Sequence, residues 1–278
     1  MQKKYIIGLI CLSIILFSFS CAIPIVAASE LHWYLKRHHG GTPGFPKEAE
    51  LFSKYDAFYL DKSVTDDKKV IYLTFDAGYE NGNIERILDT LKEEGVPSAF
   101  FLLDNIILKN TDLVNRMADE GHLICNHTKN HKNLSSASKD AICKDLCALE
   151  NIYKEKTGRE MSKYFRFPEG RYSLEALKCV KDMGYKTVFW SFAYDDWDNH
   201  KQPDPEKAIK KILDNTHNGA VMLFHPTSRT NADIFPRLIK AWREMGYSFG
   251  TLDDLTSTGN NNYKGALCPL FYAPTIYL

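Results

Sequence analysis

The stretch Val70-Ile-Tyr-Leu-Thr-Phe-Asp-Ala-Gly-Tyr-Glu-Asn-Gly82 decides the fold class of this 278-residue chain. Its first six residues are mostly apolar, β-branched or aromatic, which predicts a buried strand over residues 70–75. The strand ends at Asp76, and Gly78 and Gly82 allow a tight turn into a helix that begins near Asn83. A carboxylate at the C-terminal end of a parallel strand is where α/β proteins place reactive groups. An Asp at this position is equally suited to capping the next helix.

The same alternation of a short apolar strand and a helix continues along the chain. Crossovers of this kind predict a parallel sheet. Because about 200 residues is short for a full eight-stranded barrel, we expect an α/β fold that is a distorted, incomplete (β/α) barrel of about seven parallel strands. Further strands are expected at 98–103, 122–126, 164–167, 187–191, 220–224 and 247–250, with helices at 83–94, 111–120, 136–156, 173–183, 205–217 and 233–245.

The first residues of the chain have the layout of a secretory signal. Lys3 and Lys4 precede an apolar run, and the small residues at 26–28 suit cleavage, so residues 1–28 are expected to be a signal peptide. An uncleaved anchor is the alternative, because apolar character continues through residues 5–27 and would associate the protein with a membrane. We expect a protein that is secreted or held at the cell envelope.

The other segments and the composition complete the outline. Residues 29–69 lack periodicity and are expected to form a solvated N-terminal arm, residues 70–256 the main domain, and residues 257–278 a tail without an assigned role. The formal net charge is zero, which gives no reason to expect a nucleic-acid partner. A monomer is expected.

Polar side chains follow five of the expected strands. A barrel-like sheet brings the C-terminal ends of its strands to one rim, so these groups are expected to converge. Two histidines four residues apart on a helical turn face the same way and suit a metal ion, although such a pair alone is more often incidental. The groups are Asp76, His127 with His131, Arg166, Asp196 and His225.

Together these residue types suit hydrolysis. A bound metal ion lowers the pKa of a water molecule, and Asp76 is placed to take the proton of that water as a general base. His225 is a candidate general acid for the leaving group. Arg166, paired with Asp76 or with Asp196, would hold the charges in place.

Five ordered motifs resemble those of the polysaccharide deacetylases, the family with the NodB-homology domain. The resemblance covers about residues 70–254, and five motifs in order are far more specific than any one of them. It implies hydrolysis of acetyl groups from N-acetylated sugars or acetylated xylan on a distorted (β/α) barrel. The motifs are Thr74-Phe-Asp-Ala-Gly78, His127-x-x-x-His131, Arg166-x-Pro168-x-Gly170, Asp196-Trp197 and Leu223-x-His225.

The resemblance also implies a role for each motif residue. Asp76 matches the catalytic base and His225 the catalytic acid, while Arg166 matches the residue that tunes the base, with Asp196 as its partner. The backbone N–H of Glu169 would join the metal in stabilising the oxyanion. The remaining motif residues would be the metal ligands His127 and His131 and the acetyl-pocket walls Trp197 and Leu223.

Two positions depart from the family pattern. Ala77 stands where the family usually has a second Asp that completes the metal site, and a methyl group cannot bind metal. Glu169 replaces a usual Tyr, although only its backbone amide is needed. We therefore expect a weakly bound divalent metal, with zinc as the expected ion. Glu80 is close in sequence, but nothing in the sequence shows that it reaches the metal.

These departures resemble one subgroup, the δ-lactam-forming muramic acid deacetylases of spore-forming bacteria. The stretches 78–82, 126–134 and 189–197 share this resemblance. It implies peptidoglycan glycan strands as the partner, peptide-free N-acetylmuramic acid as the substrate, and muramic δ-lactam in the spore cortex as the eventual product. Tyr194 and Trp197 are candidates for stacking on sugar, and equally for core packing.

Two alternatives stay open. One is a chitin-type or acetylxylan deacetylase. The other is an inactive carbohydrate-binding relative, with Ala77 as the mark of a lost metal site. Retention of Asp76, Arg166 and His225 argues against the second, because a binding module does not need a base and an acid together.

Overall fold

The computed structural model describes residues 29–37, 41–65 and 67–257. The expected signal peptide or anchor, and the expected tail beyond residue 257, therefore lie outside the described residues. Within the described ranges, no helix combines the length and the apolar character that a membrane crossing requires.

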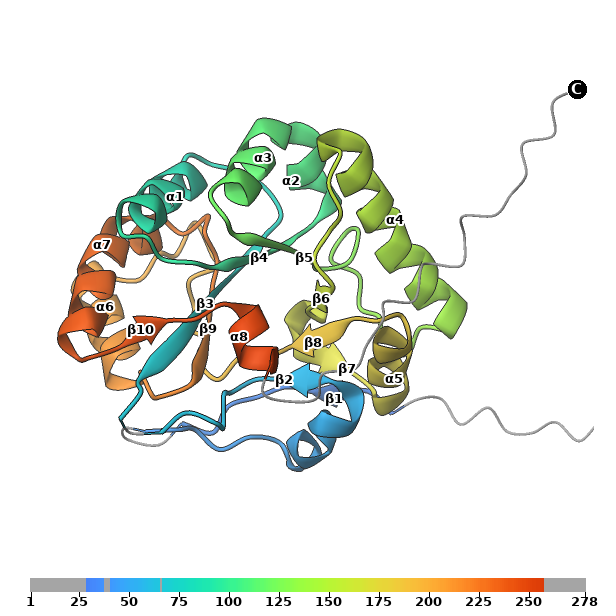
Figure 1. Cartoon of the computed structure of the whole chain (residues 1–278), viewed down its shortest axis with the longest axis horizontal. Coiled ribbons are helices and arrows are strands. Elements are labelled where there is room, and N and C mark those ends of the chain that lie inside the picture. Colours follow the sequence, from blue (N-terminus) through green and yellow to red (C-terminus); the bar gives the residue numbers. More distant parts are fainter. Residues whose placement is uncertain (1–28, 38–40, 66, 258–278) are drawn as a thin grey trace, which may run out of the picture.

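A parallel sheet curls through the centre of the molecule, and most of the helices surround it (Figure 1). The strand order is β10-β3-β4-β5-β6-β8-β2, with β9 pairing with β3, and every neighbouring pair is parallel. All seven predicted strands and the incomplete barrel are confirmed, and β2 is an eighth strand. The strands are β2 (Ala57–Phe58), β3 (Val70–Ala77), β4 (Ala99–Leu102), β5 (Leu123–Asn126), β6 (Tyr164–Phe165), β8 (Lys186–Val188), β9 (Ala220–Phe224) and β10 (Ser248–Phe249).

Strand β3 is the centre of this sheet. It pairs with β4 over residues 74–77, with β9 over residues 71–75 and with β10 over residues 70–71. The first six side chains of β3 are buried, as its continuous apolar sequence predicts for a strand covered on both faces. This register carries Asp76 to the end of the strand, beyond the core.

Between β8 and β9 regular pairing gives way to isolated contacts. The backbone N–H of Ser191 donates to the carbonyl of Val221 at 2.9 Å, and that of Leu223 donates to the carbonyl of Phe192 at 2.8 Å. The barrel is therefore distorted on this side, and the chain after β8 bends away toward the rim.

Helices follow most of the strands. Four of them begin at a side-chain N-cap (Ser138, Ser173, Asp204 and Ser228), and the predicted start at Asp204-Pro205 is confirmed. Helix α7 begins at Arg229, four residues before the predicted start, because Ser228 caps it. The helices are α1 (Asn83–Glu93), α2 (Asp104–Lys109), α3 (Thr111–Asp119), α4 (Lys139–Thr157), α5 (Leu174–Asp182), α6 (Pro205–Asp214), α7 (Arg229–Glu244) and α8 (Leu252–Ser257).

The expectation of a solvated N-terminal arm is wrong for the described residues before β3. Strand β1 (Leu31–His32) pairs with β7 (Arg171–Tyr172), and β2 extends the main sheet beside β8 (Figure 1). Between them runs the 3-10 helix η1 (Lys47–Tyr55). Trp33 is only 5% exposed, and its ring stacks on Phe52 and Phe189 at centroid distances of 5.4 and 4.9 Å. The segment is thus a packed wall of the barrel.

Candidate active site

The predicted polar residues come together at the C-terminal rim of the sheet. Asp76 is the penultimate residue of β3, and His127, Arg166 and His225 each follow directly after their strand. Asp196 lies in the irregular segment after β8. The convergence predicted from the strand order is therefore observed, and it arises from the parallel arrangement of the strands.

Arg166 holds Asp76. The arginine is fully buried, and its Nη1 donates to Oδ1 of Asp76 at 2.7 Å. The other donors are also used, since Nη2 donates to Oγ1 of Thr74 and Nε to the carbonyl of Val188, each at 2.9 Å. Burial by itself raises the pKa of Asp76, but the charge of Arg166 and those of the nearby histidines outweigh it and hold this pKa below its usual value. Asp76 is therefore an ionised carboxylate at neutral pH.

His127 and His131 lie side by side, but not on one helical turn as the sequence suggested. They belong to an irregular loop in which Thr128 and His131 have positive φ, and their ring centroids are 5.0 Å apart. Nδ1 of His127 donates to the carbonyl of Arg166 at 2.9 Å, and Nε2 lies 3.4 Å from Oδ2 of Asp76. Burial lowers the pKa of His127 to about 4, so this ring is neutral, the form that binds metal.

The third metal ligand of the family pattern has no substitute in the described part of the chain. Ala77 is 1% exposed and packs in the core. Glu80 accepts a hydrogen bond from the backbone N–H of Gly82, at the start of α1. Among the described residues no group of three or more His, Cys, Asp or Glu side chains is arranged to hold a metal ion. The residues therefore fit a metal only as a pair of imidazole ligands.

Asp196 holds His225, not Arg166, and this corrects the expected pairing. Nδ1 of His225 donates to Oδ1 of Asp196 at 2.7 Å, and the backbone N–H of His225 donates to Oδ2 at 2.8 Å. The hydrogen bonds of Arg166 go instead to Asp76, Thr74 and the carbonyls of Val188 and Phe189. Burial lowers the pKa of His225, but the buried Asp196 carboxylate outweighs that effect and raises it above its usual value.

Asn231 supports this pair and was missed by the sequence analysis. It is fully buried in the first turn of α7, and its Nδ2 donates to Oδ2 of Asp196 at 2.7 Å and to the carbonyl of His225 at 3.1 Å. The hydroxyl of Tyr194 donates in turn to Oδ1 of Asn231. No motif marks an asparagine in this helix, so sequence reasoning had no signal by which to find it.

A cleft of about 640 Å³ opens above these groups. Trp197, which lines the cleft, is 63% exposed, whereas Tyr194 is only 6% exposed. Of the two aromatic residues that the sequence suggested for stacking on sugar, only Trp197 is therefore exposed. His127, Arg166 and Asp196 lie beneath the cleft and are buried. The predicted residues that line it are Asp76, His131, Glu169, Tyr194, Trp197, Leu223 and His225, and those not predicted are Arg37, Trp190, Ala193 and Asp195.

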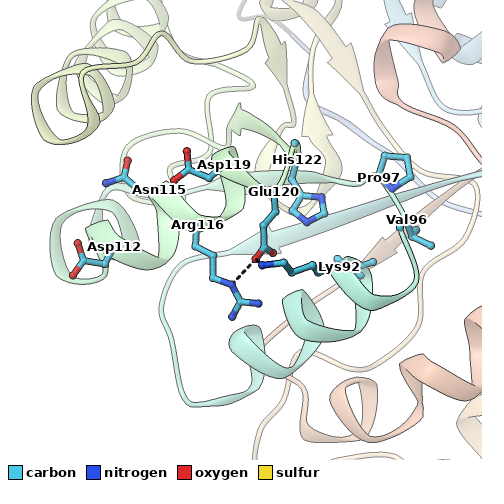
Figure 2. Close-up of a pocket in the computed structure, with 12 residues that line it drawn as sticks. Lys92, Val96, Pro97, Asp112, Asn115, Arg116, Asp119, Glu120 and His122 are labelled. Carbon is cyan, nitrogen blue, oxygen red and sulfur yellow. Dashed lines mark hydrogen bonds and ion pairs between the residues drawn. The ribbon is translucent and has the colours of Figure 1, made fainter.

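A larger hollow of about 840 Å³ lies near the N-terminal ends of β4 and β5, between α1 and α3 (Figure 2). Its charged groups are largely paired with each other: Oε1 of Glu120 lies 2.9 Å from Nε of Arg116 and 3.2 Å from Nζ of Lys92. His122 contacts Oγ of Ser98, and burial lowers the pKa of this histidine to about 4. No base and acid face each other among the described residues of this hollow, so the smaller cleft is the candidate active site.

The fold and this geometry can be compared with known proteins. The family model described as polysaccharide deacetylase matches residues 63–188. Over 255 residues the chain is 36% identical to PdaA of Bacillus subtilis, a peptidoglycan-N-acetylmuramic acid deacetylase, covering 91% of this chain and 95% of that protein. The chain belongs to the polysaccharide deacetylase family. The predicted family is confirmed.

This polysaccharide deacetylase is also similar to solved structures and to a further sequence relative. The structure of PdaA, a family 4 carbohydrate esterase, matches it with a TM-score of 0.78 and covers 84% of this chain and 99% of its own. An uncharacterized 30.6 kDa protein of Geobacillus stearothermophilus is 41% identical over 251 residues, which are 89% of this chain and 93% of that protein. A family 4 pseudoenzyme from Bacillus anthracis is 26% identical with a TM-score of 0.63, covering 69% and 66% of the two chains.

Proposed function

We propose that this polysaccharide deacetylase removes the acetyl group from N-acetylmuramic acid in peptidoglycan glycan strands. The observation that carries the proposal is that one cleft holds a carboxylate whose pKa is lowered and a histidine whose pKa is raised. Arg166 keeps Asp76 ionised, while Asp196 favours the protonated form of His225. Two titratable groups whose surroundings push their pKa values apart are suited to act as base and acid.

The cleft residues then divide the reaction between them. Asp76 takes a proton from the attacking water, and His225 gives a proton to the amide nitrogen as the C–N bond breaks. Acetate and a free amine are the products. Leu223 and Trp197 hold the acetyl group, and the backbone N–H of Glu169 donates to the oxyanion. Glu169 has a positive φ of 57°, an uncommon conformation for a residue other than glycine.

We propose that His127 and His131 hold a divalent metal, with zinc as the expected ion. Such an ion supplies Lewis-acid polarisation of the amide carbonyl and of a water molecule. Because Ala77 offers no third ligand, the metal should leave readily on dialysis against a chelator, and the deacetylation rate should then fall by at least about tenfold. Metal analysis and rate measurements before and after dialysis, with zinc added back, test this. An undiminished rate in demonstrably metal-free protein would remove the metal from the mechanism.

The substrate assignment rests on the relative PdaA, which is named for the same reaction. A peptidoglycan substrate fits export by the expected signal peptide and action at the cell envelope, and muramic δ-lactam in spore cortex is a further step of this proposal. A chitin-type or acetylxylan substrate is the alternative within the same chemistry. The Bacillus anthracis pseudoenzyme shows that inactive relatives exist, but the intact Asp76–Arg166 and Asp196–His225 pairs favour catalysis here.

Mass spectrometry of glycan fragments tests the proposal. Protein lacking residues 1–28 and supplied with Zn²⁺ should remove C₂H₂O per acetyl group from peptide-free muramic acid strands, and not from chitin oligomers or acetylxylan. The control is Asp76→Asn, which keeps an oxygen for Arg166 but cannot take the proton. It should lose at least about 100-fold in rate with its circular dichroism spectrum unchanged. Glycan binding without any mass change would instead favour the inactive relative.

A further inference from the structure

Arg37 lies in the wall of the active-site cleft and forms no ion pair with any described residue. It comes from the N-terminal segment, just after β1, and lines the cleft together with Asp76, His225 and Trp197. Its Nη2 donates to the carbonyl of Ala193, another residue of the cleft lining, and this bond anchors the guanidinium. Neither the motifs nor the proposed reaction give this residue a task.

The absence of an ion partner sets Arg37 apart from the other arginines of the described ranges. Each of the others lies within 4.0 Å of a carboxylate oxygen, and only Arg37 does not. Arg37 is also the one Lys or Arg among the described residues that line the cleft, while Asp76, Glu169 and Asp195 contribute acidic groups. An anionic ligand entering this cleft therefore has one exposed guanidinium to meet, with donors still free for bidentate binding.

We propose that Arg37 binds the lactyl carboxylate of N-acetylmuramic acid and thereby selects this sugar over N-acetylglucosamine. The proposal rests on the proposed function and identifies the lactyl carboxylate as the group of the substrate that the cleft recognises. In muramic acid the lactyl ether is attached to C3, next to the acetamide on C2. An acetamide lying between Asp76 and His225 therefore carries its carboxylate within the same cleft.

The same contact distinguishes strands with and without stem peptides. A stem peptide joins the lactyl group through an amide bond, which removes the negative charge. Arg37 then loses a charge-assisted hydrogen bond to the lactyl group. Selectivity for peptide-free strands thus follows from the charge on one carboxylate and needs no separate peptide site.

The test compares two forms of one substrate. Peptide-free glycan strands are used as they are, or after coupling their lactyl carboxylates to methylamine, which mimics the peptide bond. Arg37→Gln should lower kcat/KM on the free-carboxylate strands by about tenfold, mainly through KM, since hydrogen bonds between charged groups are worth this much. On the amidated strands Arg37→Gln and wild type should differ by less than about twofold. Arg37→Lys should recover part of the loss, because lysine restores the positive charge but lacks the planar guanidinium that donates two parallel hydrogen bonds.

Lys36→Gln is the matched control. It removes one positive charge from the neighbouring position, whose ammonium lies over the ring of Tyr34 and does not line the cleft, and it should behave as wild type on both substrates. An Arg37→Gln protein that keeps the wild-type preference for free carboxylates, or that loses activity equally on both strands, would overturn the assignment. Wild-type protein that deacetylates neither strand would show that the proposed function is wrong, and the assignment would fall with it.

Discussion

Two aspartates of the candidate active site have opposite electrostatic effects on their partners. Asp76 faces a buried guanidinium and is held ionised, whereas Asp196 faces an imidazole and favours its protonated form. The motifs predicted that all four of these side chains belong to the site. They offered Asp76 or Asp196 as the partner of Arg166, and did not predict that Asp196 pairs with His225, because Asp196 lies on the irregular segment at the distorted side of the barrel. Asn231 and Arg37 lie outside the motifs, so only the folded chain reveals them.

The pairing of Asp196 with His225 predicts a pH effect. In Asp196→Asn the negative charge is lost, so burial should dominate and the pKa of His225 should fall. Because His225 must be protonated to act as the acid, the basic limb of the kcat/KM profile should move to lower pH. Asn231→Leu leaves the charge of Asp196 in place, so it should move the limb much less than Asp196→Asn does. An unmoved basic limb in Asp196→Asn would reassign the acid.

At the scale of elements, the alternating strands and helices were predictable because each has its own period or cap. The segment before β3 was not, because its apolar residues follow no period. Trp33, Phe45, Phe52 and Tyr59 meet in one aromatic cluster through irregular backbone, and β2 is only two residues long. Tertiary packing, which a local pattern does not report, orders this segment. It also supports the cleft, since Nε1 of Trp33 donates to the carbonyl of cleft-lining Trp190 at 2.9 Å.

Trp33→Ala tests whether this packing matters. Emptying a nearly fully buried indole site should lower the free energy of unfolding by about 3–5 kcal/mol. The adjacent Tyr34 is 46% exposed, so Tyr34→Ala should change stability by no more than about 0.5 kcal/mol. Urea denaturation of both variants measures the difference. Equal effects of the two substitutions would mean that Trp33 does not pack as the structure has it.

At the scale of the whole molecule, the N-terminal segment and the barrel share one core. Strand β2 continues the ladder beyond β8, where the backbone N–H of Phe189 donates to the carbonyl of Phe58 at 2.8 Å. The carbonyl of Gly219, beside β9, accepts from the backbone N–H of Asp61 at 2.9 Å. The segment thus contacts both β8 and the residue before β9, the two strands between which regular pairing is lost. We infer that residues 29–257 fold as one unit.

This inference predicts the behaviour of two truncated proteins. A chain that begins at residue 29 should unfold in a single transition, with calorimetric and van't Hoff enthalpies that agree. A chain that begins at residue 67 exposes the edge of β8 and the rings that Trp33 and Phe52 cover, and it should lose its near-ultraviolet circular dichroism and aggregate. A soluble chain from residue 67 with native near-ultraviolet signals and deacetylase activity would show instead that the barrel folds alone. The segment before it would then be an added layer, and Arg37 would be its contribution to the cleft.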